Sequence, residues 1–146
     1  MVRIDNKTRS GIVGQETFGP LAVLLVGFLW TDFDRFLTLM EEMEADQVKV
    51  VPCTTAMLSG TLQDALEVEP IPHYQQPALG QRRALILSGM YGSEVVEMVA
   101  SYKEAGLPPC VFAAAVPNNY QRKVVDLVKE VYADHEAMTK RKQSAQ

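Results

Sequence analysis

The chain carries the same hydrophobic pattern twice in succession. An apolar run at 21–27, followed by a helical pattern, recurs without a gap from 83–89 onward, so that Gly27 corresponds to Gly89. Few residues are identical, but apolar positions correspond to apolar positions, as in the pairs Phe33 and Val95, Phe36 and Met98, Val50 and Phe112, and Leu66 and Val128. This pattern predicts two similar halves, each built as strand, helix, strand and helix.

The length of the chain places both halves in one domain. It has 146 residues, of which 47% are hydrophobic and 22% are charged, as is typical of a globular domain with a single core. Two β-α-β units with continuous apolar strands favour a sheet that is buried on both faces. We therefore expect an α/β fold with a four-stranded, mostly parallel sheet of order 2-1-3-4 and helices on both faces.

Shifts in composition divide the chain into an arm, one domain and a tail. The N-terminal part is rich in turn formers, and a stretch rich in proline and glutamine separates the two halves. The C-terminal residues are basic and are expected to fray. The predicted boundaries are a flexible arm at 1–20, an α/β domain at 21–138 with halves 21–68 and 83–130 and a connector at 69–82, and a tail at 139–146.

Capping residues indicate where individual helices begin and end. Thr31 offers an N-cap oxygen, and Asp32 follows it in the first turn of the first predicted helix. A second, shorter helix is expected at 61–68. Gly106 is placed to end the helix of the second half, and residues 117–119 are placed to cap the last helix.

Hydropathy and charge argue against several classes of protein. The longest apolar stretch, 21–30, is shorter than the ~20 residues that span a bilayer. Residues 1–19 lack the apolar core of a secretory signal, which favours an intracellular protein, in a cytosol or in a chloroplast stroma after removal of a transit peptide. The net charge of −4 and the pI near 5.2 argue against sequence-independent nucleic-acid binding and favour a basic partner.

The chain shows no recognisable set of catalytic or metal-binding residues. Cys53 and Cys110 lack the spacing of a metal site, and their predicted strand positions are too far apart for a disulfide, so both are expected to be reduced core residues. No Ser-His-Asp order and no carboxylate pair in an apolar setting is apparent, and His73 and His135 are expected at the surface. We therefore assign no catalytic residue, metal ligand or cofactor.

A binding crevice is expected beyond the carboxyl ends of strands one and three, where the order of the sheet reverses. If these strands are parallel, large apolar groups from the first half meet a glycine-rich turn from the second. Aromatic residues at such positions often anchor an interface, and acidic residues of the first helix would form its rim. The predicted partner-binding residues are Phe28, Leu29, Trp30, Asp32, Asp34, Met90 and Tyr91.

The turn at Gly89, Gly92 and Ser93 allows a second interpretation. Backbone N–H groups at a helix N-terminus can bind an anionic metabolite, which would make this a ligand-sensing or enzymatic domain. The turn lacks the G-x-G-x-x-G fingerprint and the P-loop lysine, and a tight turn with an N-cap is the more common role of such residues. A third interpretation is a self-associating structural protein, in which the apolar loop closes a two-fold homodimer.

Four stretches of the second half carry a resemblance to a known family. They are RALILSGMYGSE from Arg83, GLPP from Gly106, VFAAAVPNN from Val111 and DHE from Asp134. Together they resemble a family of domains of unknown function found in small proteins of cyanobacteria and chloroplasts, and in particular the assembly chaperone type of the β-carboxysome shell. The chain departs from the family pattern at Tyr120, where a tryptophan is expected further along, and at 116–117, where a threonine is common.

The resemblance implies a protein of a photosynthetic organism with no catalytic residues to transfer, whose partner is a carboxysome shell protein. It agrees with the prediction, made from the residues, of an acidic α/β domain with an aromatic crevice that suits a segment of another protein. We therefore expect a non-enzymatic protein-binding module, an assembly factor that engages a basic or apolar segment with Trp30 and Tyr91 as anchors.

Overall fold

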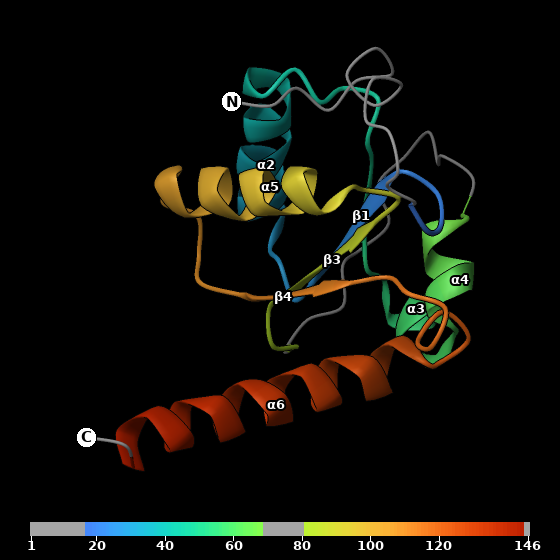
Figure 1. The fold of residues 1–146 in the computed structure, drawn as a ribbon. Coiled ribbons are helices and arrows are strands. Elements are labelled where there is room, and N and C mark those ends of the chain that lie inside the picture. The colour runs from blue at the N-terminus through green and yellow to red at the C-terminus, as the bar shows by residue number, and fades with distance from the viewer. Residues whose placement is uncertain (1–16, 69–80, 145–146) are drawn as a thin grey trace.

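A four-stranded sheet forms the centre of the computed structural model, which describes residues 17–68 and 81–144 (Figure 1). Its strands are β1 (Ala22–Val26), β2 (Lys49–Pro52), β3 (Ala84–Ser88) and β4 (Val111–Ala114), in the order β2-β1-β3-β4. The predicted α/β class, the strand order and the mostly parallel character of the sheet are confirmed. Nearly all of the predicted connector and most of the predicted N-terminal arm lie outside the described residues.

The two central strands run antiparallel, whereas the two outer pairs are parallel. Ala22 pairs with Ser88 and Val26 with Ala84, while β1 runs in the same direction as β2 and β3 in the same direction as β4. A parallel central pair, the simplest expectation from two β-α-β units, is therefore wrong. A strand that is buried on both faces has a continuous apolar pattern in either direction, so the pattern of β3 does not determine its direction.

Helices cover both faces of the sheet, as predicted. One face carries α2 (Trp30–Glu42) and α5 (Gly92–Glu104), and the other carries α3 (Thr55–Ser59), α4 (Leu62–Leu66) and α6 (Val124–Ser144) (Figure 1). Successive residues of β1 point to opposite faces, so Leu24 joins the core with α4 and α6, whereas Val23 and Leu25 join the core with α2 and α5. The sheet thus separates two hydrophobic cores.

Elements of the two halves have matching bounds in the register that sets Gly27 against Gly89. In this register β1 corresponds to β3, α2 to α5 and β2 to β4, residue by residue. Two residues after each of these helices the chain has a positive φ, 56° at Glu44 and 72° at Gly106. A left-handed residue ends a helix and redirects the chain, as was expected of Gly106. The repetition of the sequence itself stays a prediction.

Helix α2 begins earlier than predicted, and it begins without a capping oxygen. Its N-cap is Leu29, which makes no side-chain hydrogen bond to the helix, and Thr31 is an exposed residue of the first turn. The rings of Trp30 and Phe33 pack edge to face in this turn, with their centroids 5.4 Å apart. Aromatic packing therefore stabilises the start of α2, where the sequence predicts a threonine cap.

The helix expected at 61–68 is α4 (Leu62–Leu66), and Thr61 is its cap rather than its first residue. Thr61 caps α4 in a capping box: its hydroxyl accepts from the Asp64 N–H at 3.1 Å, and the Asp64 carboxylate accepts from the Thr61 N–H. The short helix α3, which precedes it, is not predicted by the sequence pattern. The Thr54 hydroxyl caps α3 by accepting from the Met57 N–H at 3.3 Å.

The last helix begins later than predicted and ends later as well. Asn119, expected as its cap, instead closes a turn, because its side chain accepts from the Val116 N–H at 2.9 Å and donates to the Ala114 carbonyl at 2.9 Å. Helix α6 starts at Val124 and continues to Ser144, through most of the predicted tail. None of the helices in the described ranges combines the length and the hydrophobicity needed to cross a bilayer.

Candidate functional site

The two predicted parts of the binding crevice lie at opposite ends of the central strand pair. In the antiparallel register, the carboxyl end of β1 pairs with the start of β3 at Ala84, and the carboxyl end of β3 pairs with the start of β1 at Ala22. Residues 28–30 therefore follow one end of the pair, and residues 89–92 follow the other. A crevice shared by Trp30 and Tyr91 requires parallel central strands, so this prediction is wrong.

The loop after β1 presents apolar groups at three different depths. Phe28 is buried and packs edge to face on Tyr102, with the ring centroids 6.4 Å apart. Leu29 is 53% exposed, and Trp30 is half-buried beside Phe33. Phe28 is thus a core residue, whereas Leu29 and Trp30 form an apolar patch at the start of α2, called the Leu29/Trp30 surface below.

The two predicted rim acids lie in different environments. Asp34 is exposed to solvent. Asp32 is buried, and its carboxylate oxygens lie 3.9 Å from a guanidinium nitrogen of Arg35 and 3.9 Å from one of Arg83. Asp32 therefore connects α2 to the start of β3, and of the two acids Asp34 is the one that a partner can reach.

The turn after β3 is closed by contacts within the chain. Gly89 is buried at a φ of 72°, and its N–H donates to the Phe18 carbonyl at 2.9 Å. The buried Glu94 carboxylate accepts from the Tyr91 N–H at 2.7 Å, at the N-terminus of α5. A negative charge of the protein itself therefore lies where the alternative interpretation requires a bound anion. Anion binding at this turn stays a prediction, and it requires displacement of these contacts.

The remaining residues of this turn form no patch comparable to the Leu29/Trp30 surface. Met90 and Tyr91 are half-buried, and Met90 packs against the core that α2 and α5 share with the sheet. Gly92 and Ser93 are exposed in the first turn of α5. The turn after β3 therefore presents small residues and half-buried side chains at the carboxyl end of that strand.

A cluster of polar side chains lies where β3 and β4 begin, and the sequence does not predict it. Arg83 lies 3.9 Å from the Asp32 carboxylate, and its backbone carbonyl accepts from the Tyr132 hydroxyl at 2.5 Å. Tyr102 and the half-buried Cys110 interact beside it and line a pocket of about 260 Å³. These residues come from different helices and strand ends, so no spacing along the chain could reveal the cluster.

The cluster is not arranged as a nucleophilic centre. Burial raises the pKa of the Cys110 thiol above its ordinary value of 9.0 and the pKa of Tyr102 above 10.0. Burial also raises the pKa of Cys53 to about 12. All three groups are protonated at neutral pH, whereas a reactive cysteine is a thiolate. Both cysteines are free, as predicted, but only Cys53 is fully buried.

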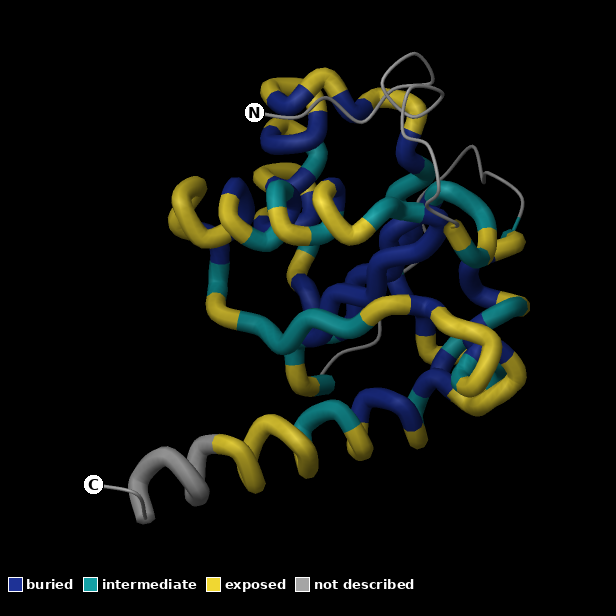
Figure 2. The backbone as a smooth tube through the Cα atoms, in the orientation of Figure 1, coloured by how far each residue is buried: buried dark blue, intermediate teal, exposed yellow. Residues whose placement is uncertain are grey.

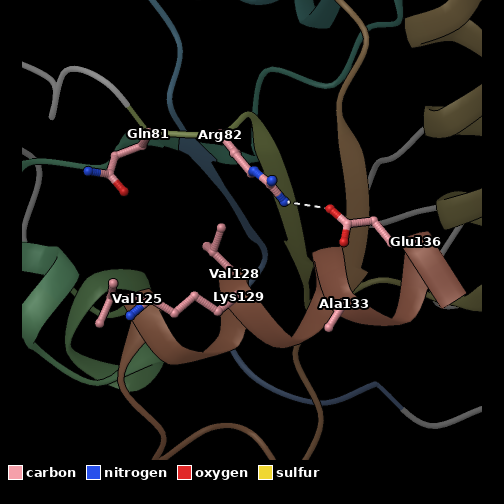
Figure 3. Close-up of a pocket in the computed structure, with 7 residues that line it drawn as sticks. All are labelled: Gln81, Arg82, Val125, Val128, Lys129, Ala133 and Glu136. Carbon is pink, nitrogen blue, oxygen red and sulfur yellow. Dashed lines mark hydrogen bonds and ion pairs between the residues drawn. The ribbon is translucent and has the colours of Figure 1, made fainter.

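A second pocket, of about 280 Å³, opens between α6 and the chain that leads into β3 (Figure 3). Arg82 crosses it, with its guanidinium 4.8 Å from the centroid of the Tyr132 ring and 3.0 Å from the Glu136 carboxylate. Both ionic partners are exposed, so the pair contributes about 0–1 kcal/mol. The pocket is lined by Gln81, Arg82, Val125, Val128, Lys129, Ala133 and Glu136, and none of these charged groups is buried.

The described residues define a small α/β domain with a mixed sheet, in which no three or more His, Cys, Asp and Glu side chains are grouped so that they could hold a metal ion. Residues 83–138, from the start of β3 into α6, match the family described as Domain of unknown function (DUF3783). Neither the curated proteins nor the solved structures include a match to the chain. The match supports the coarse resemblance to a family of domains of unknown function in the second half.

Proposed function

We propose that this protein is a non-enzymatic protein-binding module that acts as an assembly factor. The observation that carries the proposal is the Leu29/Trp30 surface, a leucine that is 53% exposed beside a half-buried tryptophan at the start of α2. Tryptophan is enriched among the residues that contribute most to protein interfaces. A partner that covers this surface removes apolar area from water, which stabilises the complex by ~25 cal/mol per Å².

Asp34 near this surface, together with exposed acids at the far end of α2, favours a basic partner segment. Asp34 is exposed in α2, and Glu41 and Glu42 are exposed at the end of the same helix. The chain as a whole has a net charge of −4. Charges at the rim of an interface mainly accelerate association and select the partner. The proposed partner segment therefore combines basic residues, which face the acids of α2, with an apolar residue that covers Leu29 and Trp30.

The finer proposal is that this partner is a carboxysome shell protein of a photosynthetic organism, held by a segment of its chain. Its support is the resemblance of the stretches between Arg83 and Glu136, which fall within the residues matched by the family of unknown function. Holding a segment requires a surface and no reactive group. The protonated state of Cys53, Cys110 and Tyr102 at neutral pH is in keeping with such a role.

Affinity capture with matched variants tests the proposal. The wild-type chain, a Leu29→Asp/Trp30→Ala variant and a Tyr91→Ala variant are immobilised and exposed to a cyanobacterial lysate, and the bound proteins are quantified by mass spectrometry. We expect the wild-type chain and Tyr91→Ala to enrich a shell protein, because Tyr91 follows the opposite end of the central strands. We expect the Leu29→Asp/Trp30→Ala variant to lose it.

The two ways in which the proposal can fail are distinguishable. Circular dichroism and thermal unfolding first establish that each variant is folded. A shell protein captured equally by all three chains would exclude the Leu29/Trp30 surface as the binding site. If no protein is captured by any of the folded chains, the binding-module function itself is rejected.

A further inference from the structure

Strand β4 is an edge strand whose outer side pairs with no other strand within the described residues. It pairs only with β3, as Figure 1 shows at the front of the sheet. The N–H groups of Val111 and Ala115 donate to the carbonyls of Arg83 and Leu87 at 3.2 and 2.8 Å. Backbone groups of a strand alternate between its two sides, so the N–H groups of Phe112 and Ala114 point away from β3.

The sequence of β4 lacks the charged residues and prolines that protect many edge strands, so its short length is its main protection. Its four residues, VFAA, include no charged residue, no glycine and no proline. Three of them are half-buried and Ala114 is exposed (Figure 2). Charged side chains, prolines and bulges are the usual means by which proteins prevent pairing at an edge. The edge formed by β4 is therefore open to another strand at Phe112 and at the Ala114 N–H, whereas the outward Ala114 carbonyl accepts from the Asn119 side chain at 2.9 Å.

The opposite edge of the same sheet does carry these features. In β2, the N–H groups of Lys49 and Cys53 donate inward, to Leu21 and Leu25, at 3.1 and 2.9 Å. The outward positions are then those of Val50 and Pro52, and a proline has no N–H to offer. The Lys49 ammonium donates to the Val68 carbonyl at 2.9 Å, so its charge lies beside the chain that follows α4. The register that sets Gly27 against Gly89 places Lys49 at Val111 and Pro52 at Ala114, so the two edges differ at these two positions.

The helix beside the open edge has exposed apolar residues at positions where the helix beside the protected edge has polar ones. Val96 of α5 is 70% exposed and Ala100 is exposed, whereas the corresponding residues of α2, Asp34 and Thr38, are polar. Val96 lies one helical turn from Val99, which is half-buried at the margin of the core. The open strand is thus accompanied by exposed apolar residues of α5, with the exposed Lys103 on the same side of the helix, and the protected strand by polar residues of α2.

We propose that β4 pairs antiparallel with β4 of a second copy of this chain, giving a continuous sheet of order β2-β1-β3-β4-β4-β3-β1-β2. This inference does not depend on the proposed function. A two-fold contact buries both open edges and leaves only the β2 edges, which carry Lys49 and Pro52, at the ends of the sheet. A foreign strand would leave a new edge of its own. The absence of charge in β4 means that no like charges face each other between the two paired strands.

Strand pairing by itself does not account for a stable dimer. Specific interfaces bury about 1,200–2,000 Å² in total, and two four-residue strands supply only part of that area. The two α5 helices lie on the same face of the joined sheet, so Val96, Val99 and Ala100 of each copy supply further apolar contact. In this arrangement Val96 is covered by the second copy, whereas it is 70% exposed in a single copy.

Sedimentation equilibrium of the full chain tests the proposal. We expect the wild-type chain to shift from its 16.2 kDa monomer to twice that mass as its concentration rises from about 1 to about 100 µM. Ala114→Pro and Val111→Lys copy the residues of the protected edge, and Val96→Asp copies Asp34 of α2. Each is expected to weaken the dimer at least 10-fold. Met138→Lys, on a residue of α6 that is 58% exposed, is the matched control and is expected to leave dimerisation unchanged.

Hydrogen exchange locates the interface and gives a second, independent test of the proposal. In the dimer the amides of Phe112 and Ala114 are expected to exchange at least 10-fold more slowly than in the dilute monomer. Val96→Asp changes an exposed helical residue, so it serves as the folded variant if Ala114→Pro does not fold. A wild-type chain that stays monomeric overturns the proposal. The proposal is also overturned if Val96→Asp and Val111→Lys leave the dimer intact. It is overturned as well if Leu29→Asp dissociates the dimer without any change in the exchange of the β4 amides.

Discussion

Gly27 and Gly89 each end a central strand and lie against the backbone that leads into the other strand. A Cβ atom on Gly27 would lie 2.5 Å from the Gln81 carbonyl oxygen, and one on Gly89 would lie 2.6 Å from the Pro20 carbonyl oxygen. Both residues have a positive φ, of 79° and 72°. Glycine is required at each position for two reasons: the backbone is left-handed, and a Cβ atom would collide with neighbouring backbone atoms. The antiparallel pairing of β1 with β3 depends on both glycines.

Gly27→Ala is expected to lower the free energy of unfolding by about 2–4 kcal/mol, because the new methyl group combines a left-handed backbone with a contact to backbone atoms that cannot move aside. Urea denaturation followed by circular dichroism measures the change. Gly92→Ala is the control, since nothing lies within 4 Å of its Cβ position and its φ is ordinary. That control should change stability by no more than about 1 kcal/mol, and in the stabilising direction. Equal losses in the two variants would contradict the explanation.

Removal of the side-chain charge is expected to lower the free energy of unfolding much more at Asp32 than at Asp34. Asp32→Asn removes a buried carboxylate that faces both Arg35 and Arg83, and it should lower the free energy of unfolding by about 1–2 kcal/mol. Asp34→Asn changes an exposed residue of the same turn and should stay within about 0.5 kcal/mol of the wild type. Chemical denaturation of both variants is the measurement. A larger loss from Asp34→Asn would mean that the Asp32 contacts are unimportant.

Thr61, which caps α4, and Thr31, which the sequence predicts as the cap of α2, give a further paired test. Thr61→Ala removes a hydroxyl that accepts from the Asp64 N–H, and it should cost about 1 kcal/mol. Thr31→Ala should cost much less than that, because α2 starts at Trp30 with Leu29 as its N-cap. Thermal unfolding of the two variants distinguishes the outcomes. A greater effect of Thr31→Ala would place the start of α2 where the sequence alone predicts it.

The stability of the protein is expected to fall as the pH rises above 9. Burial raises the pKa of Cys53 from 9.0 to about 12, so the unfolded chain loses this proton at a lower pH than the folded chain does. The contribution is fully present below pH 9 and is lost as the pH rises toward 12, at about 1.4 kcal/mol per pH unit. Burial also raises the pKa of Tyr102, which acts in the same direction above pH 10.

Denaturant titrations between pH 8 and 11 measure this dependence, and Cys53→Ala isolates one group. The variant should retain a fall in stability, because Tyr102 is still present, but its slope above pH 9 should be smaller by about 1.4 kcal/mol per pH unit. An unchanged slope in Cys53→Ala would show that another group controls the alkaline limit.

Several local features could be predicted from the sequence because their causes are local. The apolar run at 21–27 identifies β1, and the helical spacing that follows identifies α2, although not its first residue. Thr61 and Gly106 act as the cap and the stop that their residue types favour. Thr31 does not, because α2 begins one residue earlier, at Trp30, whose ring packs on Phe33.

The candidate site could be predicted only in part. Leu29 and Trp30 are accessible at the start of α2, as the sequence indicates for an aromatic residue after a strand. Their pairing with Tyr91 could not be tested by any pattern, because it depends on the direction in which β3 joins the sheet. The cluster around Arg83 and Cys110 was equally inaccessible to sequence reasoning, since its members come from separate elements.

The sequence by itself indicated the four strands and their order, and four of the five helices although not all of their ends. Hydrophobic periodicity and residue class reflect interactions between residues close together in the chain, so they can be recognised from the sequence alone. Only the tertiary structure decided that β1 and β3 are antiparallel, that Trp30 and Tyr91 are separated, and that Asp32 meets Arg83. These relationships depend on contacts between residues far apart in the chain, and a strand that is buried on both faces has the same apolar pattern whichever way it runs.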